Sequence, residues 1–198
     1  GFTERTTTDG RRVKQSGKGR ELSLIIDNLN SEGQGVARSG RDVYFVPGAL
    51  VGEKVRVRML ERSKKIWHTQ LLAIEADEAQ ARRSADCPHY QRCGGCDLQH
   101  MQYDAQVQFK QSRVEREFGR QKVTVENWAA PLVSEEWHYR RKARLGARFS
   151  KEQQKNFIGF REAASSHLTD IDRCIVLPDH PALDWSEWRR IIGSLESA

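Results

Sequence analysis

The chain has 198 residues, of which 37% are hydrophobic and 30% are charged, so it can bury the core of one large domain or of two small ones. No apolar run is long enough for a membrane-spanning helix, and no apolar segment near the N-terminus resembles a secretory signal. We therefore expect a cytoplasmic protein without a membrane partner. Lys and Arg outnumber Asp and Glu by 33 to 27, and the net charge of +6 favours a polyanionic partner, most commonly nucleic acid.

Residues 1–20 are rich in Thr, Gly, Arg and Lys, and Phe2 is their one large apolar residue before Val13. Such a segment cannot bury enough apolar surface to order itself. We expect a flexible, solvated basic tail. A basic arm that contacts RNA is the alternative.

Residues 21–78 predict a small β-barrel. Apolar and polar residues alternate in short segments, as where Val55 and Val57 point away from Arg56 and Arg58. Five such strands in so short a stretch are typical of a closed barrel of the oligonucleotide-binding type. The basic strand residues predict contacts with an RNA backbone, with a solvated strand face as the alternative. These residues are Arg56, Arg58, Lys64 and Lys65.

Residues 79–198 predict an α+β domain with an antiparallel sheet. A helix is expected at about residues 101–121, where apolar residues recur at helical spacing: Tyr103, Val107, Val114 and Phe118. Strict alternation then predicts a strand with one apolar face, formed by Ala143, Leu145, Ala147 and Phe149. A second strand at residues 157–162 would complete a hairpin. Near the C-terminus, Asp179 is expected to cap a helix that carries Trp185, Trp188, Ile192 and Leu195 on one face.

The four cysteines predict a metal centre. Cys87, Cys93 and Cys96 have the spacing C-x5-C-x2-C, and Cys174 lies far along the chain. Thiolates are soft ligands, and three from one loop with one from a distance suit a [4Fe–4S] cluster. Zinc is the alternative, although all-cysteine zinc sites more often use two C-x2-C pairs. Disulfides or a redox-active C-x2-C pair fit less well, because nothing indicates secretion and no thioredoxin-like setting precedes the pair.

The densest basic cluster of the chain follows the predicted helix. It lies beside Trp137 and Tyr139, and cations next to aromatic rings suit single-stranded RNA. A solvated sheet face is again the alternative. The predicted RNA-binding residues are Arg140, Arg141, Lys142, Arg144 and Arg148.

Longer motifs run through the chain in a specific order. They are E-G-Q-G-V-A-R at 32–38, Y-F-V-P-G-A-L-V-G-E at 44–53, C-P-H-Y-Q-R-C-G-G-C-D-L-Q-H at 87–100, Y-R-R-K-A-R-L at 139–145, G-F-R at 159–161 and D-I-D-R-C at 170–174. Together they resemble the 23S rRNA uracil-5-methyltransferases of the RumA (RlmD) type. The resemblance implies that residues 21–78 are a TRAM domain and that the four cysteines ligate a [4Fe–4S] cluster in a central domain. The related tRNA uracil-5-methyltransferases lack the barrel and this cysteine set, so they are expected to fit less well.

Members of that family also have a C-terminal domain that binds S-adenosylmethionine and supplies a catalytic cysteine and a glutamate base. This chain has no Gly-rich strand-to-helix turn for that cofactor, and its cysteines are assigned to the metal. We therefore expect an incomplete chain: the RNA-recognition and iron–sulfur portion of an enzyme that methylates C5 of a uridine in 23S rRNA, inactive alone. S-adenosylmethionine would bind only to the full-length protein. The alternative is a standalone metal-containing RNA-binding or regulatory protein.

The resemblance also bears on the helix at 101–121, because it places this helix against the absent catalytic domain. An apolar helix face without its partner marks an interaction site or an aggregation hazard. We therefore expect the helix to be poorly ordered or to pair with a second copy of the chain in a homodimer.

Overall fold

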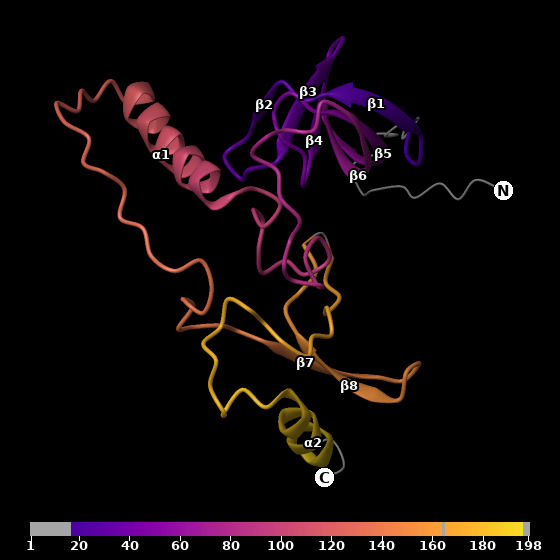
Figure 1. The fold of residues 1–198 in the computed structure, drawn as a ribbon. Helices are drawn as coiled ribbons and strands as arrows, with labels where there is room; N and C mark the ends of the chain where they lie inside the picture. The colour runs from indigo at the N-terminus through magenta and orange to yellow at the C-terminus, as the bar shows by residue number, and fades with distance from the viewer. Residues whose placement is uncertain (1–16, 164, 196–198) are drawn as a thin grey trace. The chain divides into compact units, whose positions relative to one another are not determined.

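The computed structural model describes residues 17–163 and 165–195 (Figure 1). They fall into two units, of which the first ends at Ala79 and the second begins at Gln80. None of the helices within these ranges is long and apolar enough to cross a membrane.

The predicted flexible tail lies mainly on residues 1–16, outside the described residues. Its last residues are attached to the first unit by backbone hydrogen bonds. The Gly19 amide donates to the Met59 carbonyl oxygen over 2.7 Å, and the Met59 amide donates to the Arg20 carbonyl oxygen over 2.9 Å. Gly19 and Arg20, which the prediction included in the tail, are therefore held against β5.

The first unit is a curved six-stranded sheet. Its strands are β1 (Glu21–Ile25), β2 (Asn28–Leu29), β3 (Gly35–Ser39), β4 (Asp42–Val46), β5 (Lys54–Ser63) and β6 (Ile66–Ala76). Their order across the sheet is β1-β5-β6-β4-β3-β2, with β4 and β6 parallel and the other neighbours antiparallel. The predicted closed barrel is not formed, because β2 has two residues, pairs with β3, and leaves β1 as the opposite free edge.

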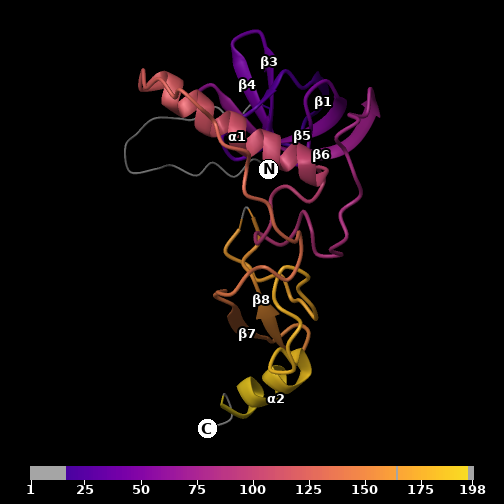
Figure 2. The ribbon, with the colours of Figure 1, turned by 60° about the vertical axis from the view of Figure 1, so that its left-hand side comes forward.

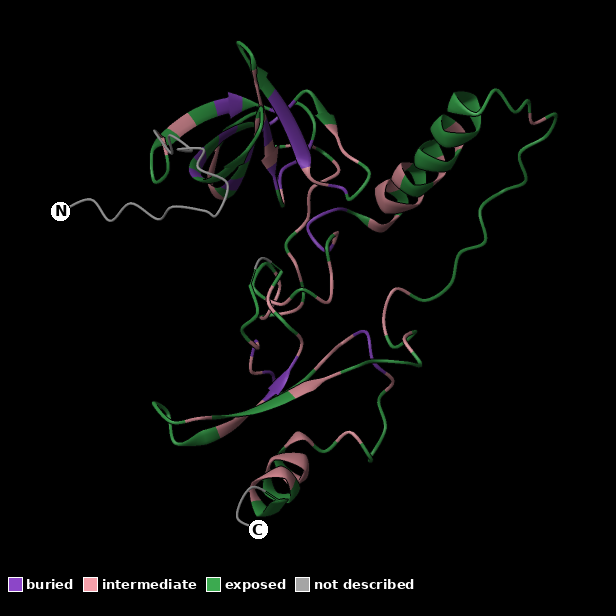
Figure 3. Ribbon diagram, turned by 180° about the vertical axis from the view of Figure 1, so that it is seen from behind, coloured by how far each residue is buried: buried purple, intermediate pink, exposed green. Residues whose placement is uncertain are grey.

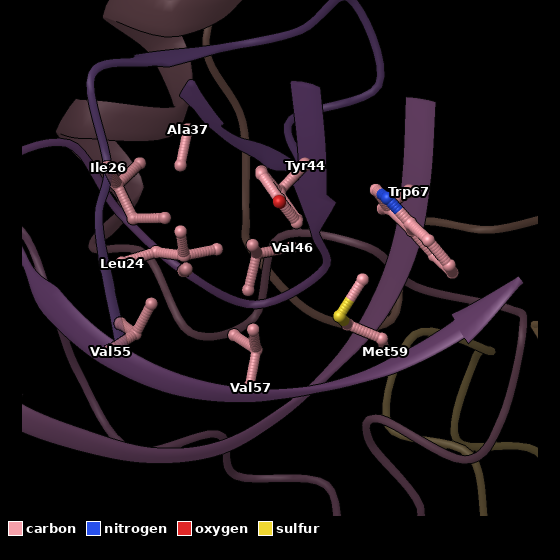
Figure 4. Packing of buried hydrophobic residues seen from close by; sticks show 10 residues of the cluster. Leu24, Ile26, Ala37, Tyr44, Val46, Val55, Val57, Met59 and Trp67 are labelled. Atoms are coloured by element: carbon pink, nitrogen blue, oxygen red, sulfur yellow. The ribbon is translucent and has the colours of Figure 1, made fainter. Parts of the chain in front are cut away.

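The core of this unit lies inside the curve of the sheet (Figure 4). Val55 and Val57 on β5 are fully buried, whereas Arg56 and Arg58 between and beside them are exposed, as their alternation predicts. Trp67 on β6 is also buried. The remaining buried members of the core are Leu24, Ile26, Ala37, Tyr44, Val46, Ala49 and Met59. Burial of this apolar surface is what stabilises a sheet with two unpaired edges.

The second unit contains α1 (Tyr103–Arg120), β7 (Gly146–Ser150), β8 (Lys155–Gly159) and α2 (Trp185–Leu195) (Figure 2). The antiparallel β7–β8 hairpin is present, but β7 begins at Gly146 and not near Lys142. Ala147 and Phe149 share one face of β7, but both are exposed, as is Ala143 before the strand. Most of β7 is exposed (Figure 3). The sheet has no third strand among the described residues, and α2 packs mainly against β8, so β7 is left largely uncovered.

The predicted helix near residues 101–121 is formed as α1, and none of its residues is buried. Val114 and Phe118 on the expected apolar face keep 45% and 40% of their surface exposed. The chain after the helix covers part of this face: the rings of Phe118 and Trp128 pack edge to face with centroids 5.7 Å apart. Farther along, the Tyr103 hydroxyl donates to the Ser134 carbonyl oxygen over 2.9 Å.

Helix α2 begins later than predicted. Asp184, not Asp179, is its N-cap, because the Asp184 carboxylate accepts hydrogen bonds from the amides of Ser186 and Glu187, each over 3.0 Å. Both aspartates precede apolar residues, and the cap is decided by which one directly precedes the first helical turn. The predicted cap at Asp179 is therefore wrong.

Candidate metal centre

The four cysteines line one pocket of the second unit. Its empty space, including the open mouth, is about 360 Å³. None of the four thiols is in a disulfide, and each is partly exposed. Non-cysteine residues of the pocket wall are His89, Tyr90, Gly95, Gln99, Arg140, Phe160, Ile171, Arg173, Ile175 and Val176.

Residues 87–96 form a loop that is held by the chain after β8. The Gly94 amide donates to the Arg161 carbonyl oxygen over 2.9 Å, and Cys93 forms a β-bridge with Glu162. The contact requires glycine, because a Cβ atom on Gly94 would lie 2.7 Å from the same Arg161 carbonyl oxygen. Arg92 and Glu162 add an ion pair of 2.8 Å. The loop is therefore fixed from outside, with its cysteines left on the pocket wall.

Cys174 reaches the pocket from a different segment. Residues 175 and 176, which follow it, accept backbone hydrogen bonds from His138 and Arg140, over 3.0 and 2.9 Å. The Leu177 amide donates back to the Cys174 carbonyl oxygen over 3.2 Å and closes a turn. The fourth cysteine is thereby held beside the other three, although 78 positions separate it from Cys96.

The thiols of the loop are in an environment that disfavours bare thiolates. Burial raises the pKa of Cys93 and of Cys96, and the charges of the neighbouring thiolates raise it further. The positive charge of Arg140 lowers the pKa of Cys96. A positively charged metal centre would favour the thiolates over the thiols, because coordination favours the deprotonated sulfur.

Polar groups around the loop are engaged with one another. His89 Nε2 lies 3.1 Å from Asp172 Oδ1, and this hydrogen bond lowers the pKa of the Asp172 carboxyl. The Tyr90 hydroxyl contacts His100 Nδ1 and donates to the Asp97 carbonyl oxygen, while burial raises the pKa of Tyr90 to about 12. These side chains brace the loop, in the way that hydrogen-bonding partners of metal ligands hold those ligands in place.

Throughout the described residues, no three His, Cys, Asp or Glu side chains are grouped as the ligands of a single metal ion. The four cysteines line the wall of one pocket.

The predicted RNA-binding residues of the second unit divide into two groups. Arg141, Lys142, Arg144 and Arg148 are exposed and, among the described residues, have no ion-pair partner. Arg140 differs, because its guanidinium Nη2 donates to the Gly95 carbonyl oxygen over 3.2 Å and faces the cysteine loop. Sequence reasoning missed this role, since it depends on the pairing of distant segments.

The predicted RNA-binding residues of the first unit lie on β5 and in the turn that follows it. Arg56, Lys64 and Lys65 are exposed. Arg58 is also exposed, but it forms an ion pair of 2.7 Å with Glu21 on β1. Three of the four are thus available to phosphate groups, whereas Arg58 would first have to leave its carboxylate.

A TRAM domain family profile matches residues 15–65. The chain is 40% identical to the 23S rRNA (uracil(1939)-C(5))-methyltransferase RlmD of Shewanella sediminis over 79% of its length, and 38% identical to the protein of that name from Pseudomonas entomophila over 85%. It spans little more than a third of these curated relatives, 36% and 37%.

Among solved structures, the chain is similar to the tRNA (uracil-54, C5)-methyltransferase of Pyrococcus abyssi in complex with S-adenosyl-L-homocysteine. The TM-score is 0.54 and the identity 28%, over 88% of this chain and 36% of that one. So broad a match includes most of the sheet unit, and the expectation that tRNA enzymes lack a counterpart of it is wrong for this one. The chain thus contains a TRAM domain and, over most of its length, matches the 23S rRNA (uracil-5)-methyltransferases of the RlmD type.

Proposed function

We propose that this chain is the RNA-recognition and iron–sulfur portion of an S-adenosylmethionine-dependent methyltransferase that acts on C5 of a uridine in 23S rRNA. The similarity to RlmD proteins across four fifths of the chain carries the proposal. Methyl transfer and cofactor binding would belong to the part of those relatives that this chain does not match. The 198 residues alone would bind RNA in the cytoplasm without catalysing.

The RNA-binding part of the proposal is supported by the TRAM match and by the exposed cations of both units. Cations with no carboxylate partner gain most from phosphate groups, because binding releases counterions from the RNA without breaking an ion pair. Three such cations lie close together in one exposed segment: Arg141, Lys142 and Arg144. The TRAM sheet adds Arg56, Lys64 and Lys65.

The iron–sulfur part is supported by the donor set. Four thiols line one pocket, and thiolates are the ligands that iron–sulfur clusters take. Each cysteine of a [4Fe–4S] cluster binds a different iron atom, so the sulfurs lie around the cluster and not around a single ion. The pocket would hold such a cluster through Cys87, Cys93, Cys96 and Cys174. When bound, the cluster would join the cysteine loop covalently to the distant Cys174 segment.

RNA binding by this chain tests the proposed function. A 23S rRNA fragment containing the uridine that the relatives methylate would be compared with an unrelated hairpin of equal length, in fluorescence anisotropy titrations at several salt concentrations. We expect weak binding to both, with affinity that falls steeply as salt rises. Sequence preference should be poor, because base flipping and base reading are assigned to the unmatched catalytic region. Absence of binding at low salt would contradict the proposal.

A further inference from the structure

We propose that Arg140 is a positioning residue of the metal centre and not an RNA contact: it joins the two segments that supply the cysteines and places a positive charge beside the cluster. The inference rests on the proposed iron–sulfur centre and adds a role for a residue outside the ligand set. It separates Arg140 from the four exposed cations that follow it in the sequence.

The backbone of Arg140 is fixed to the segment of the fourth cysteine. Its amide donates to the Val176 carbonyl oxygen over 2.9 Å, and the His138 amide donates to the Ile175 carbonyl oxygen over 3.0 Å. Val176 is buried and lies two residues after Cys174. Any shift of the Arg140 backbone would therefore be passed to the segment that holds Cys174.

The side chain of Arg140 reaches the other cysteine segment. Guanidinium Nη2 donates to the Gly95 carbonyl oxygen over 3.2 Å, and Gly95 lies between Cys93 and Cys96 on the loop. Arg140 is partly buried on the pocket wall, whereas its neighbour Arg141 is exposed. One residue thus contacts both halves of the centre, with its backbone on one side and its side chain on the other.

The positive charge of Arg140 is opposite in sign to that of the cluster that the pocket would hold. A [4Fe–4S] core with four thiolates carries a net negative charge, which becomes more negative when the cluster accepts one electron. The pocket wall has Arg140, Arg173 and His89 as its basic groups, and no Asp or Glu lines it among the described residues. A partly buried cation acts more strongly than one in water, and net charge and hydrogen bonding set the potential of such clusters. Arg140 would therefore stabilise the bound cluster and favour its reduced form.

Two substitutions at neighbouring positions test the inference. Arg140→Gln removes the charge that faces the pocket, and Arg141→Gln removes the same charge from the exposed surface. Each protein, purified without oxygen, is measured for iron per chain, for the rate at which its visible absorption is lost in air, and for the midpoint potential of its one-electron couple with dithionite as reductant. RNA affinity is measured on the same samples.

For Arg140→Gln we expect cluster loss in air to be about tenfold faster or more, the usual scale for removing a group that orients metal ligands. The midpoint potential should become more negative. Arg141→Gln should keep the wild-type cluster and lose RNA affinity. Arg140→Lys keeps the positive charge and the backbone hydrogen bond, so its midpoint potential should lie between those of Arg140→Gln and the wild type. If the Gln variant does not fold, the Lys variant is measured in its place.

Two results would overturn the inference in distinguishable ways. A wild-type protein that purifies without iron would refute the cluster itself, and the role of Arg140 with it. A wild-type protein with a full cluster, together with an Arg140→Gln variant whose cluster lifetime and potential equal those of Arg141→Gln, would refute the role of Arg140 alone. In the second case, a loss of RNA affinity in Arg140→Gln would return this residue to the RNA-binding group.

Discussion

The Asp170 carboxylate accepts a hydrogen bond from Arg189 Nη2 over 2.8 Å, and this contact attaches α2 to the segment that follows the β7–β8 hairpin. Asp170 also lies 2.9 Å from Lys155 Nζ and accepts from the Ile158 amide over 3.1 Å. Arg189 Nη2 also donates to the Ile171 carbonyl oxygen over 2.7 Å, so this guanidinium is one of the contacts that hold α2.

Replacing Asp170 by Asn should destabilise the second unit by about 2 kcal/mol, the usual scale for leaving partly buried hydrogen-bonding partners unmatched. Asp179→Asn is the matched control, because Asp179 is exposed and does not cap α2. Urea denaturation followed by far-UV circular dichroism measures the difference. Equal free energies of unfolding for the two variants would show that the Asp170 contacts do not support α2.

Acid should destabilise the second unit by protonating the Asp170 carboxylate. Partial burial raises the pKa of Asp170, but hydrogen bonds from Arg189, Lys155 and the Ile158 amide outweigh burial and hold it below its usual value. A lowered pKa in the folded state gives stability that is present above the unfolded pKa of about 3.9 and is lost as pH falls through the folded pKa. Below about pH 4, the wild type should therefore lose more stability than Asp170→Asn, as measured by thermal unfolding from pH 6 to pH 2. Parallel pH profiles would contradict this account.

Local sequence patterns predicted the elements whose burial is decided locally. The alternation at Val55 and Val57 gives buried side chains on β5, and apolar residues at helical spacing give α1. The same alternation at Ala143 and Ala147 gives no buried face, because burial also requires an element packed over the strand, and α2 packs mainly against β8. Periodicity thus indicates the type of element and leaves its packing undecided.

Features that depend on distant partners could not be predicted. Glu53 is fully buried and accepts amide hydrogen bonds from Leu50 over 2.8 Å and from Ala79 over 3.2 Å, so a carboxylate in a turn motif holds the end of the first unit. Arg140 likewise faces the cysteine loop because residues 138–140 pair with 175–177. The four cysteines, which their spacing assigns to one metal centre, do line one pocket, and their role as metal ligands stays a prediction.

Cys174→Ser should lower metal content and thermal stability together. As a metal ligand, Cys174 would close a long loop to the other three cysteines, and the free energy of metal binding becomes free energy of folding when the site exists only in the folded state. The variant should melt close to the temperature of wild-type protein from which iron has been stripped, and well below that of the loaded protein. A variant with a full complement of iron and wild-type melting would exclude Cys174 as a ligand.

The exposed cations of the second unit should set the salt dependence of RNA binding. Replacing Arg141, Lys142 and Arg144 together by Ala should flatten the slope of log affinity against log salt by roughly 0.7 for each phosphate group that the variant no longer neutralises. A control that removes three exposed cations from α1 and its end, Lys110, Arg113 and Lys122, has the same net charge and should keep the wild-type slope. Equal slopes for the two triple variants would mean that the segment at residues 141–144 is merely solvated.

The apolar face of α1 should make the chain self-associate. Val114 and Phe118 remain substantially exposed, and Trp128 covers only part of the face. We expect a monomer–dimer equilibrium in sedimentation velocity over a wide concentration range, and Val114→Gln should shift it toward monomer. A strictly monomeric wild type, with strong hydrogen-exchange protection throughout α1, would contradict the dimer.

Metal analysis of the protein as purified without oxygen tests whether the four cysteines hold an iron–sulfur cluster. Iron, acid-labile sulfide and zinc would be determined per chain, together with the visible absorption spectrum, before and after reduction. We expect about four iron and four sulfide per chain, a broad absorption that weakens on reduction, and little zinc. One zinc per chain with no iron or sulfide, or four free thiols with no metal at all, would contradict this expectation.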